Sequence, residues 1–391
     1  MAPSKLKEAV SQLVRRSPIP STVFAAPRHY SSSTLAQSQR EAGIAYRAVF
    51  PATTIQRQPS RTWAVAHEKL EHPQRLDVPD SFVACLKQGR VFNRATGIAT
   101  SGDCLLGDLS AHPGRFDADD HYLLGDLRPR WTRRVPGAVC VLASEHKTAS
   151  CYYHWMLDAL PRLHLCQQSG DFERADLVYV QDGTRRFQRE TLDILGVPPD
   201  RIITSDEVRD FVADELIVGS YSAPVGWTRH ETINFLRDAF LPRDAQSKPG
   251  RLLYVSRQDG NTRAVGNESG LEAALSDLGF ETVTLSTMSV REQAALFHQA
   301  DAIVGGHGSG LTNLVFCQPG TIVVELFAPS YVPTCFWGLA EQLGLKHWHI
   351  VGDSSPLSAR QDAMEHDIIV DVPQLTAAVA AVLDESSRRA A

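Results

Sequence analysis

Residues 305–313 read GGHGSGLTN, and this stretch decides how the second half of the chain is expected to fold. It follows the apolar run DAIV (301–304), so a strand should end here and a helix should begin. Because a helix N-terminus presents unpaired N–H groups and a partial positive charge, it binds anions. Glycines in such a loop remove the Cβ atoms that would hold a phosphate away. The stretch therefore predicts a strand, a tight turn and a helix in succession, and the turn is a candidate anion site.

The loop does not match two familiar nucleotide-binding patterns. A dinucleotide fingerprint counted from Gly306 and Gly308 needs a third glycine where Leu311 stands. A Walker loop needs Lys-Ser or Lys-Thr after its last glycine, but Leu-Thr follows Gly310. On the loop alone, a phosphate site and a tight turn capped by His307 both remain open.

Strand and helix patterns alternate around this loop through the second half of the chain. Apolar runs predict five strands, at 251–257, 281–285, 300–306, 321–327 and 346–351. Between them, SVRE (289–292) is a capping box, and Gly279 and Gly344 are expected to end two helices. This alternation is typical of a parallel, doubly wound sheet.

The middle of the chain shows a weaker version of the same alternation. Strands are expected at 137–143, 176–181, 202–204 and 215–220, and helices at about 152–167 and 185–195. The polar stretch LPRDAQSKPG (241–250) is typical of a domain boundary. We therefore expect an α/β fold with two Rossmann-like domains, 76–245 and 246–391, preceded by a partly disordered N-terminal extension, 1–75.

Length and composition indicate a two-domain protein and argue against several classes of protein. The 391 residues suit two domains better than one core. A formal net charge of −6 argues against a basic nucleic-acid-binding surface. Seven scattered cysteines without a C-x-x-C pair argue against a disulfide framework and a structural zinc site, so a reducing compartment is expected.

The N-terminal residues are basic. No apolar run reaches the length of a membrane span, and no compact apolar core marks a secretory signal. Residues 1–40 are rich in Lys, Arg and Ser, which fits an organelle transit peptide. A basic arm, or a short helix on an anionic membrane surface, is the simpler interpretation. We expect a cytoplasmic protein with a peripheral membrane contact through this segment.

Three charged residues are expected near the glycine loop. Arg257 ends the strand 251–257 and Arg263 follows in a polar loop, so both lie at the sheet edge where ligands bind. Two guanidinium groups and a helix N-terminus suit a diphosphate, although each arginine alone could be a solvated loop charge. Glu325 lies inside the apolar strand 321–327, where a carboxylate is costly without partners. It either accepts hydrogen bonds from ribose hydroxyls or lies at a surface edge.

A second constellation lies in YYHWMLDALPR (152–162). On a helix, His154 and Asp158 are four residues apart and share a face. Among apolar neighbours such a pair is a natural general-base unit. A buried pair that only satisfies its own hydrogen bonds is the alternative.

Three stretches together, in this order and at this spacing, resemble glycosyltransferase family 61, which includes capsular-polysaccharide-type bacterial proteins. They are YYHWMLDALPRL (152–163), the set Ser256, Arg257, Arg263, Asn267 and Glu268, and GGHGSGLTNLVFCQPGTIVVEL (305–326). The resemblance covers roughly residues 80–370, and its last stretch is the most specific.

The resemblance implies a GT-B-like architecture, in which two Rossmann-like domains face each other across a cleft. It implies inverting, metal-independent transfer of a sugar from a nucleotide sugar, such as UDP-xylose or UDP-N-acetylglucosamine, to a glycan or glycolipid. No metal or cofactor is then expected, since the nucleotide sugar is a co-substrate. By motif, His154 and Asp158 match the family's first-domain pair. The donor-side matches are Arg257, Arg263, His307, Gly308, Ser309, Gly310, Asn313 and Glu325.

On this interpretation the C-terminal half holds the donor and the first half brings the acceptor, in polysaccharide biosynthesis. Asp158 is expected to remove the acceptor proton, because a carboxylate is the usual base in inverting transferases, and His154 is the alternative base. Rival hypotheses are a nucleotide-sugar epimerase or hydrolase of the same architecture and a non-catalytic carbohydrate-binding protein. An NAD-dependent oxidoreductase would need the dinucleotide fingerprint that the loop lacks.

Overall fold

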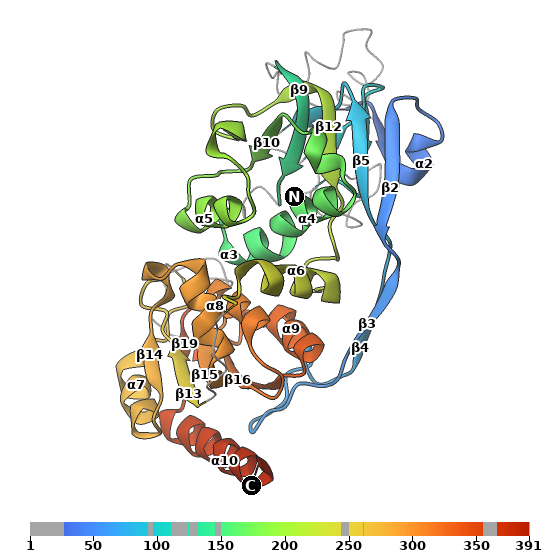
Figure 1. Ribbon diagram of the computed structural model, residues 1–391. Coiled ribbons are helices and arrows are strands. Elements are labelled where there is room, and N and C mark those ends of the chain that lie inside the picture. Colours follow the sequence, from blue (N-terminus) through green and yellow to red (C-terminus); the bar gives the residue numbers. More distant parts are fainter. Residues whose placement is uncertain are drawn as a thin grey trace, which may run out of the picture. The chain divides into compact units, whose positions relative to one another are not determined.

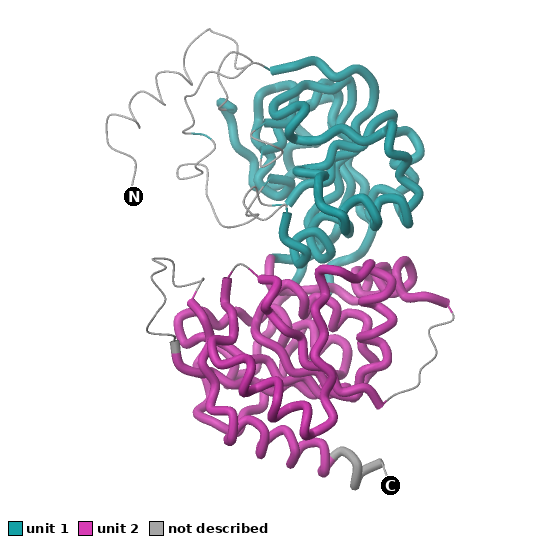
Figure 2. Tube along the Cα trace, turned by 90° about the vertical axis from the view of Figure 1, so that its left-hand side faces the viewer, with its two compact units in different colours: residues 1–53, 78–224 teal, residues 54–77, 225–391 magenta. Residues whose placement is uncertain are grey.

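The computed structural model describes residues 27–92, 97–110, 124, 132–144, 150–243, 250–260, 262–354 and 366–390. The chain packs into two compact units, residues 1–53 with 78–224 (unit 1) and residues 54–77 with 225–391 (unit 2) (Figure 2). Each unit has a sheet of its own. The basic segment up to residue 26, for which we expected a membrane contact, lies outside the described residues.

Unit 2 is built on a parallel five-stranded sheet in the order β14-β13-β15-β16-β17 (Figure 1). Its strands are β13 (Arg251–Val255), β14 (Glu281–Val283), β15 (Ala300–Gly306), β16 (Ile322–Phe327) and β17 (Lys346–Val351). All five strands predicted for the second half are confirmed. The β16 strand is buried along its whole length, as expected for an apolar parallel strand covered on both faces.

The helices of unit 2 begin and end at the predicted signals. Ser289 and Glu292 form the expected capping box, and Gly279 and Gly344 adopt positive φ angles of 86° and 68° at the expected helix ends. The helix expected within the glycine loop is a 3₁₀ helix, η7 (Ser309–Phe316). The other elements are α6 (His230–Phe240), α7 (Glu268–Asp277), η6 (Leu285–Thr287), α8 (Val290–His298), α9 (Cys335–Leu343), α10 (Val372–Ala390) and the short pair β18 (Asp353–Ser354) with β19 (Ile368–Ile369).

Unit 1 has a mixed ten-stranded sheet. Its parallel block has the order β12-β9-β10-β11 and contains the four strands predicted in the middle of the chain. The strands are β1 (His29–Ser31), β2 (Ile44–Phe50), β5 (Ser81–Lys87), β6 (Arg90–Phe92), β7 (Gly97–Ala99), β8 (Cys104–Leu106), β9 (Arg133–Leu142), β10 (Leu177–Val180), β11 (Ile202–Thr204) and β12 (Phe211–Gly219). The helices are α2 (Thr34–Ser38), α3 (Tyr152–His154), η3 (Trp155–Ala159), α4 (Leu160–Gln168), η4 (Asp171–Arg174), α5 (Arg186–Ile194) and η5 (Pro199–Arg201). The Rossmann-like alternation is thus confined to the part of unit 1 that follows β9, because the earlier strands pair mostly antiparallel.

A hairpin from early in the chain belongs to unit 2. Strand β3 (Thr53–Arg57) pairs with β4 (Gln74–Val78), and the Arg57 guanidinium lies 3.4 Å from the ring centre of Trp227. The units therefore differ from the expected domains 1–75, 76–245 and 246–391, since residues 29–50 complete the sheet of unit 1 and α6 joins unit 2. A local pattern cannot show this, because the partners of Arg57 lie about 170 positions away in sequence.

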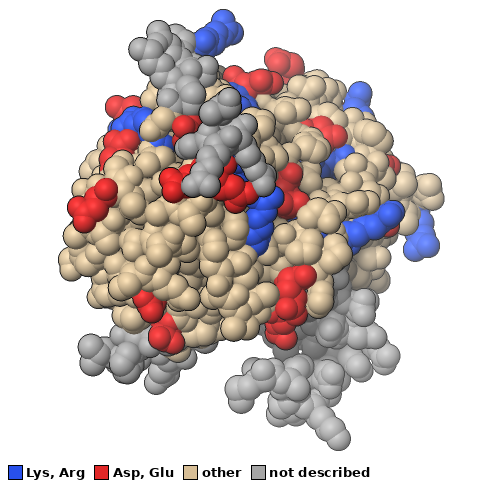
Figure 3. Space-filling model, turned by 90° about the horizontal axis from the view of Figure 1, so that it is seen from below, with Lys and Arg blue, Asp and Glu red and all other residues tan. Residues whose placement is uncertain are grey.

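Charged side chains are mixed by sign at the surface. On the face drawn in Figure 3, acidic and basic side chains are interspersed over the described residues. This distribution is in keeping with the formal net charge of −6.

Candidate functional site

The glycine loop lies at the carboxyl edge of the parallel sheet of unit 2, between β15 and η7. The His307 N–H donates to the Leu326 carbonyl at 2.8 Å, which holds the loop against β16. The backbone of Gly308 is extended, with a φ of 179°, and would suit any residue. A Cβ at this position would lie only 1.5 Å from Nη1 of Arg257. The close approach of the guanidinium is therefore what requires glycine here.

Both predicted arginines converge on the loop. Arg257 donates from Nε to the Arg263 carbonyl at 2.9 Å and from Nη2 to the Thr262 carbonyl at 2.5 Å. Arg263 donates from Nε to the His307 carbonyl at 3.1 Å. Burial and the charge of Arg263 lower the pKa of Arg257 to about 10, so it remains a cation at neutral pH. Two cations thus lie beside the N–H groups that open η7, an arrangement suited to an anion.

A buried carboxylate sets the position of Arg257. Glu268 Oε1 accepts hydrogen bonds from the Tyr254 hydroxyl at 2.8 Å, the Ser256 hydroxyl at 2.9 Å and the Arg257 N–H at 3.1 Å. Glu268 thus connects the two parts of the sequence motif, Ser256-Arg257 and Asn267-Glu268. Its carboxylate holds the end of β13, from which Arg257 extends.

The first residues of η7 are its accessible ones. Ser309 and Gly310 are half-buried, whereas Asn313 has no exposed surface. Asn313 Nδ2 donates to Gln293 Oε1 at 2.7 Å and to the Gly310 carbonyl at 3.0 Å. The expectation that Asn313 faces the ligand does not fit this burial; its amide instead ties η7 to α8.

Glu325 lies between two buried histidines. Its side chain has no exposed surface, with Oε1 at 2.6 Å from His307 Nδ1 and Oε2 at 2.9 Å from His347 Nε2. Burial raises the pKa of Glu325 well above its usual range. Burial and the charges of Arg263 and Arg257 lower the pKa of His307 well below its usual range. Because both carboxyl oxygens are engaged, neither ribose binding nor a surface edge fits Glu325.

Three residues near Glu325 were not predicted from the sequence: His347, Ser60 and His349. The Ser60 hydroxyl lies 2.7 Å from His347 Nδ1 and 2.9 Å from His349 Nδ1. The available signal was HWH (347–349) within a predicted strand, since residues two apart on a strand share a face. The serine gave no signal, because its hairpin is distant in sequence.

The predicted His–Asp pair of unit 1 lies on one turn of π-helix. His154 Nδ1 and Asp158 Oδ2 are 2.6 Å apart, so the two side chains meet as expected. The π-turn η3 (Trp155–Ala159) separates α3 from α4, and such turns recur at functional sites. The His154 side chain is 15% exposed and that of Asp158 7%, so the imidazole is the more accessible of the two.

Arg162, a buried residue of α4, anchors the helix that carries the His–Asp pair. It has no exposed surface, and it donates from Nε to the Gly219 carbonyl at 2.8 Å and from Nη1 to the Ala143 carbonyl at 2.6 Å. It also donates from Nη2 to the Leu109 carbonyl at 3.0 Å. The guanidinium therefore joins the helix of the His–Asp pair to the carboxyl ends of β9 and β12. No sequence pattern assigned it this role, since its partners are backbone groups of distant segments.

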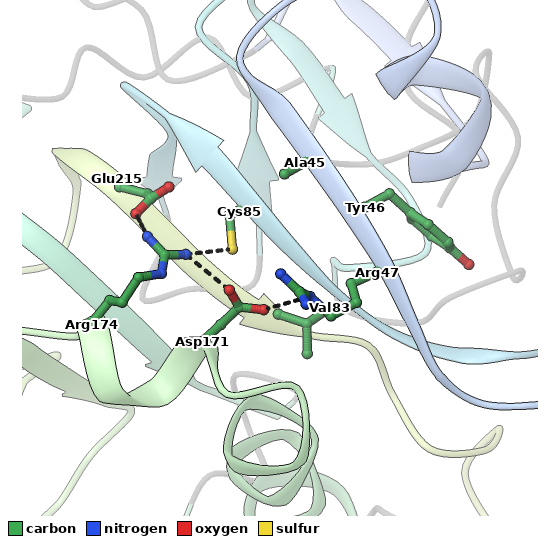
Figure 4. Close-up of a pocket in the computed structure, with 8 residues that line it drawn as sticks. All are labelled: Ala45, Tyr46, Arg47, Val83, Cys85, Asp171, Arg174 and Glu215. Atoms are coloured by element: carbon green, nitrogen blue, oxygen red, sulfur yellow. Dashed lines mark hydrogen bonds and ion pairs between the residues drawn. The ribbon is translucent and has the colours of Figure 1, made fainter.

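A separate pocket of about 270 Å³ lies in unit 1 (Figure 4). It is lined by Ala45, Tyr46, Arg47, Val83, Cys85, Asp171, Arg174 and Glu215. Arg174 pairs with Glu215 at 2.5 Å and with Asp171 at 3.0 Å, and Arg47 pairs with Asp171 at 3.3 Å. The charges of the lining residues thus satisfy one another, and we assign the pocket no role.

The described residues hold neither a cluster of possible metal ligands nor a membrane-spanning helix. They contain no group of three or more His, Cys, Asp or Glu side chains placed to hold a metal ion. Among the helices of the described part of the chain, none is both long and apolar enough to cross a membrane.

Arginines that flank a helix N-terminus at the carboxyl edge of a parallel sheet are how α/β proteins bind phosphorylated ligands. The sequence model of the family Glycosyltransferase 61 matches residues 152–324. This range contains the His–Asp pair and the glycine loop, and it ends one residue before Glu325. The match to this family model confirms the resemblance of the three sequence stretches over residues 152–324.

Two rice proteins (Oryza sativa subsp. japonica) are among the relatives. The chain is 32% identical over 168 residues to XAX1, a β-1,2-xylosyltransferase. The aligned region covers 39% of this chain and 29% of the rice protein. It is 27% identical over 175 residues to XAT2, an α-1,3-arabinosyltransferase. That aligned region covers 40% of this chain and 29% of XAT2. The chain thus matches less than a third of the length of these relatives.

Among solved structures, the dodecameric iron-containing heptosyltransferase TibC of enterotoxigenic E. coli aligns over 82% of each chain. The sequence identity is 10% and the TM-score is 0.27. This likeness is too low to define the fold, which rests on the two sheets described above.

Proposed function

We propose that this chain is an inverting glycosyltransferase that moves a sugar from a UDP-sugar to a hydroxyl group of a glycan or glycolipid, without a metal ion. The observation that carries the proposal is the convergence of Arg257 and Arg263 on Gly308 at the start of η7. The relatives named as a xylosyltransferase and an arabinosyltransferase make a pentose the first sugar to test.

The arginines and the helix N-terminus would stabilise the leaving group. When the bond between the anomeric carbon and the diphosphate breaks, negative charge grows on the diphosphate oxygen. Arg257 and Arg263 supply two positive charges there, and η7 supplies N–H donors. Charge that is already in place at a developing anion is usually the largest single catalytic contribution. These groups would take the part that a divalent cation has in other transferases.

The His154–Asp158 pair would accept the proton of the acceptor hydroxyl. One in-line displacement inverts the anomeric carbon, and its efficiency depends on a base at the attacking oxygen. Either Asp158 is the base, held by the imidazole, or Asp158 orients His154 so that Nε2 is the base. The 2.6 Å hydrogen bond serves both routes, and the greater exposure of His154 favours the second.

The proposal includes a GT-B-like arrangement, in which unit 1 presents the acceptor to a donor held by unit 2. It is supported by the division of the two constellations between two compact units, each with parallel strands. A cytoplasmic enzyme of polysaccharide biosynthesis, with a peripheral membrane contact through its basic N-terminus, is part of the same proposal.

The test is nucleotide binding by the full-length chain in the presence of EDTA. We expect UDP to raise the melting temperature by mass action, more than GDP, CMP or NAD⁺ does. Arg257→Ala should remove the shift, whereas Arg291→Ala, an exposed arginine on α8, should keep it. Turnover is then followed with UDP-xylose and a xylan acceptor. A shift with NAD⁺ alone, or donor hydrolysis that no acceptor changes, would contradict the proposal.

A further inference from the structure

A continuous chain of hydrogen bonds, buried beyond its first bond, runs from the β3–β4 hairpin to the glycine loop. It joins the His67 N–H to His349 Nε2 at 3.4 Å, His349 Nδ1 to the Ser60 hydroxyl at 2.9 Å, and that hydroxyl to His347 Nδ1 at 2.7 Å. It continues from His347 Nε2 to Glu325 Oε2 at 2.9 Å, and from Glu325 Oε1 to His307 Nδ1 at 2.6 Å. Every side chain in it is at most 8% exposed. We call this set, Ser60, His307, Glu325, His347 and His349, the histidine relay.

One backbone amide sets the direction of the relay. The His67 N–H can only donate, so His349 Nε2 must be an acceptor. Burial lowers the pKa of His349 to about 4, so the ring is neutral and carries its one proton on Nδ1. His349 Nδ1 therefore donates to the Ser60 hydroxyl oxygen.

The direction is passed on through Ser60 and His347. The Ser60 hydroxyl proton has two acceptors in reach, His347 Nδ1 at 2.7 Å and the Arg61 carbonyl at 3.4 Å. The shorter contact is the stronger hydrogen bond. Burial lowers the pKa of His347 to about 3, so this ring is neutral too, and with Nδ1 accepting it carries its proton on Nε2. His347 Nε2 thus donates to Glu325 Oε2.

The relay leaves one place for a proton on Glu325. Its Oε2 is already an acceptor, so a carboxyl proton lies on Oε1, in the 2.6 Å bond to His307 Nδ1. A carboxyl group with no exposed surface takes up a proton to avoid a buried charge, consistent with the raised pKa of Glu325. With Nδ1 accepting from Glu325, a neutral His307 must carry its own proton on Nε2.

We propose that the histidine relay makes His307 a hydrogen-bond donor, through Nε2, to a phosphate oxygen of the bound nucleotide sugar. Ser60, His347 and His349 are then positioning residues of the donor site, although none of them touches the ligand. This inference rests on the proposed function, because it names the ligand atom that His307 recognises. The hairpin 54–77, far from the loop in sequence, completes the site by supplying Ser60.

The arrangement has a physical advantage beside two arginines. A cationic imidazole there would be repelled by Arg257 and Arg263, whose charges help to lower the pKa of His307. A neutral ring with a fixed N–H adds a directed donor without a third positive charge. Hydrogen bonds that run in one direction also polarise and strengthen one another.

The first experiment reads the tautomers in the nucleotide-free, full-length protein. Histidine side chains labelled with ¹⁵N are observed by long-range ¹H–¹⁵N NMR, and each signal is assigned with a single His→Gln variant. We expect three neutral rings, with the proton on Nδ1 in His349 and on Nε2 in both His347 and His307. A proton on Nδ1 of His307, or a charged His347 or His349 at neutral pH, would overturn the proposal.

The second experiment measures the dissociation constant of UDP by calorimetry. Glu325→Ala should weaken binding by at least about tenfold, which corresponds to one hydrogen bond to a charged group. Glu325→Gln should restore most of this loss, because an amide can accept from His347 and donate to His307 as the protonated carboxyl does. If Glu325→Gln is as weak as Glu325→Ala, the carboxyl acts as an anion and the proposal fails.

Ser60 provides an independent comparison. Ser60→Ala interrupts the relay and should weaken UDP binding about threefold to tenfold, and Ser60→Thr, which keeps the hydroxyl, should recover it. Ser276→Ala, at an exposed position of α7, is the matched control and should bind as the unsubstituted protein does. Unchanged binding by Ser60→Ala would contradict the proposal. If UDP does not bind the unsubstituted protein, the proposed function fails, whereas the tautomer pattern still decides whether the relay exists.

Discussion

At the scale of the residue, Gly308 shows how one missing side chain makes room for a charge. Its extended φ carries no strain, so the only cost of a side chain is the clash with the Arg257 guanidinium. Gly308→Ala should therefore displace Arg257 and weaken UDP binding by at least about tenfold, as expected for loss of a charge-assisted hydrogen bond. Global stability should change little. Calorimetric titration with UDP and urea denaturation measure the two effects.

Gly270→Ala is the control for that substitution. Gly270 lies within α7, and a Cβ there would have no atom within 4 Å apart from its chain neighbours and the backbone of its own helix. Alanine there should keep UDP binding and should raise helix stability slightly, by up to about 1 kcal/mol. Normal UDP binding by Gly308→Ala would show that Arg257 does not need its present position.

The His154–Asp158 pair allows a second prediction at this scale. Asp158→Asn and His154→Gln should each lower kcat by about 10²–10⁴-fold, the usual loss when a positioned base is removed. Neither should change the dissociation constant of UDP, because the pair belongs to unit 1. Steady-state kinetics with saturating donor show which residue is the base. Substituting the residue that takes the proton should lower kcat more than substituting the residue that orients it. Equal turnover in both variants and the unsubstituted protein would remove the pair from the mechanism.

At the scale of the element, the β3–β4 hairpin depends on one buried cation. The Arg57 guanidinium stacks on Trp227, donates to the Gly226 carbonyl and lies 5.6 Å from the ring centre of Trp337. Arg57→Ala should lower the free energy of unfolding by at least about 2 kcal/mol, because a desolvated cation–π contact and buried hydrogen bonds are lost together. It should also speed tryptic cleavage after Lys69, an exposed residue of the hairpin, because the backbone around it is held less firmly. Urea denaturation and limited proteolysis measure these changes.

Arg75→Ala on the paired strand β4 is the matched control. The Arg75 side chain is 64% exposed and pairs with a neighbouring exposed aspartate, Asp77. Its removal should change stability by no more than about 0.5 kcal/mol. An equal loss in both variants would mean that the hairpin is not anchored through Arg57.

At the scale of the whole molecule, stability should pass through a maximum near neutral pH. His307, His347 and His349 have folded pKa values below their usual 6.5, and Glu325 has one above its usual 4.5. Between these two pH values the unfolded chain binds more protons at the three histidines and one fewer at Glu325, so stability rises with pH. Well above 6.5, Glu325 is the one of these four groups whose protonation still differs between the folded and unfolded chain. It keeps its proton when folded, so its contribution makes stability fall as pH rises.

Variants separate the two limbs of this profile in urea denaturation from about pH 5 to about pH 8. Glu325→Gln should abolish the decline on the alkaline side that Glu325 causes and steepen the rise on the acid side. His347→Gln should make the acid limb shallower. Parallel profiles for Glu325→Gln and the unsubstituted protein would show that Glu325 is ionised in the folded state.

Much of the architecture and part of the site could be predicted from local patterns. The five strands of unit 2 were predictable because buried parallel strands are short apolar runs, and its helices because Ser289, Glu292, Gly279 and Gly344 give local start and stop signals. The convergence of Arg257, Arg263 and the glycine loop followed from one rule, that the carboxyl ends of parallel strands share an edge.

The sequence by itself therefore determined the two alternating segments, the edge of the sheet where the site lies, and the His154–Asp158 contact, because each depends on neighbours within a few residues. Only the tertiary structure decided that the hairpin 54–77 belongs to unit 2, that Asn313 points inward, and that Glu325 is held between His307 and His347. These outcomes depend on contacts between segments up to about 290 positions apart. Hydrophobic periodicity and helix caps carry no information on such contacts, because a buried carboxyl and an exposed one can occupy the same strand pattern.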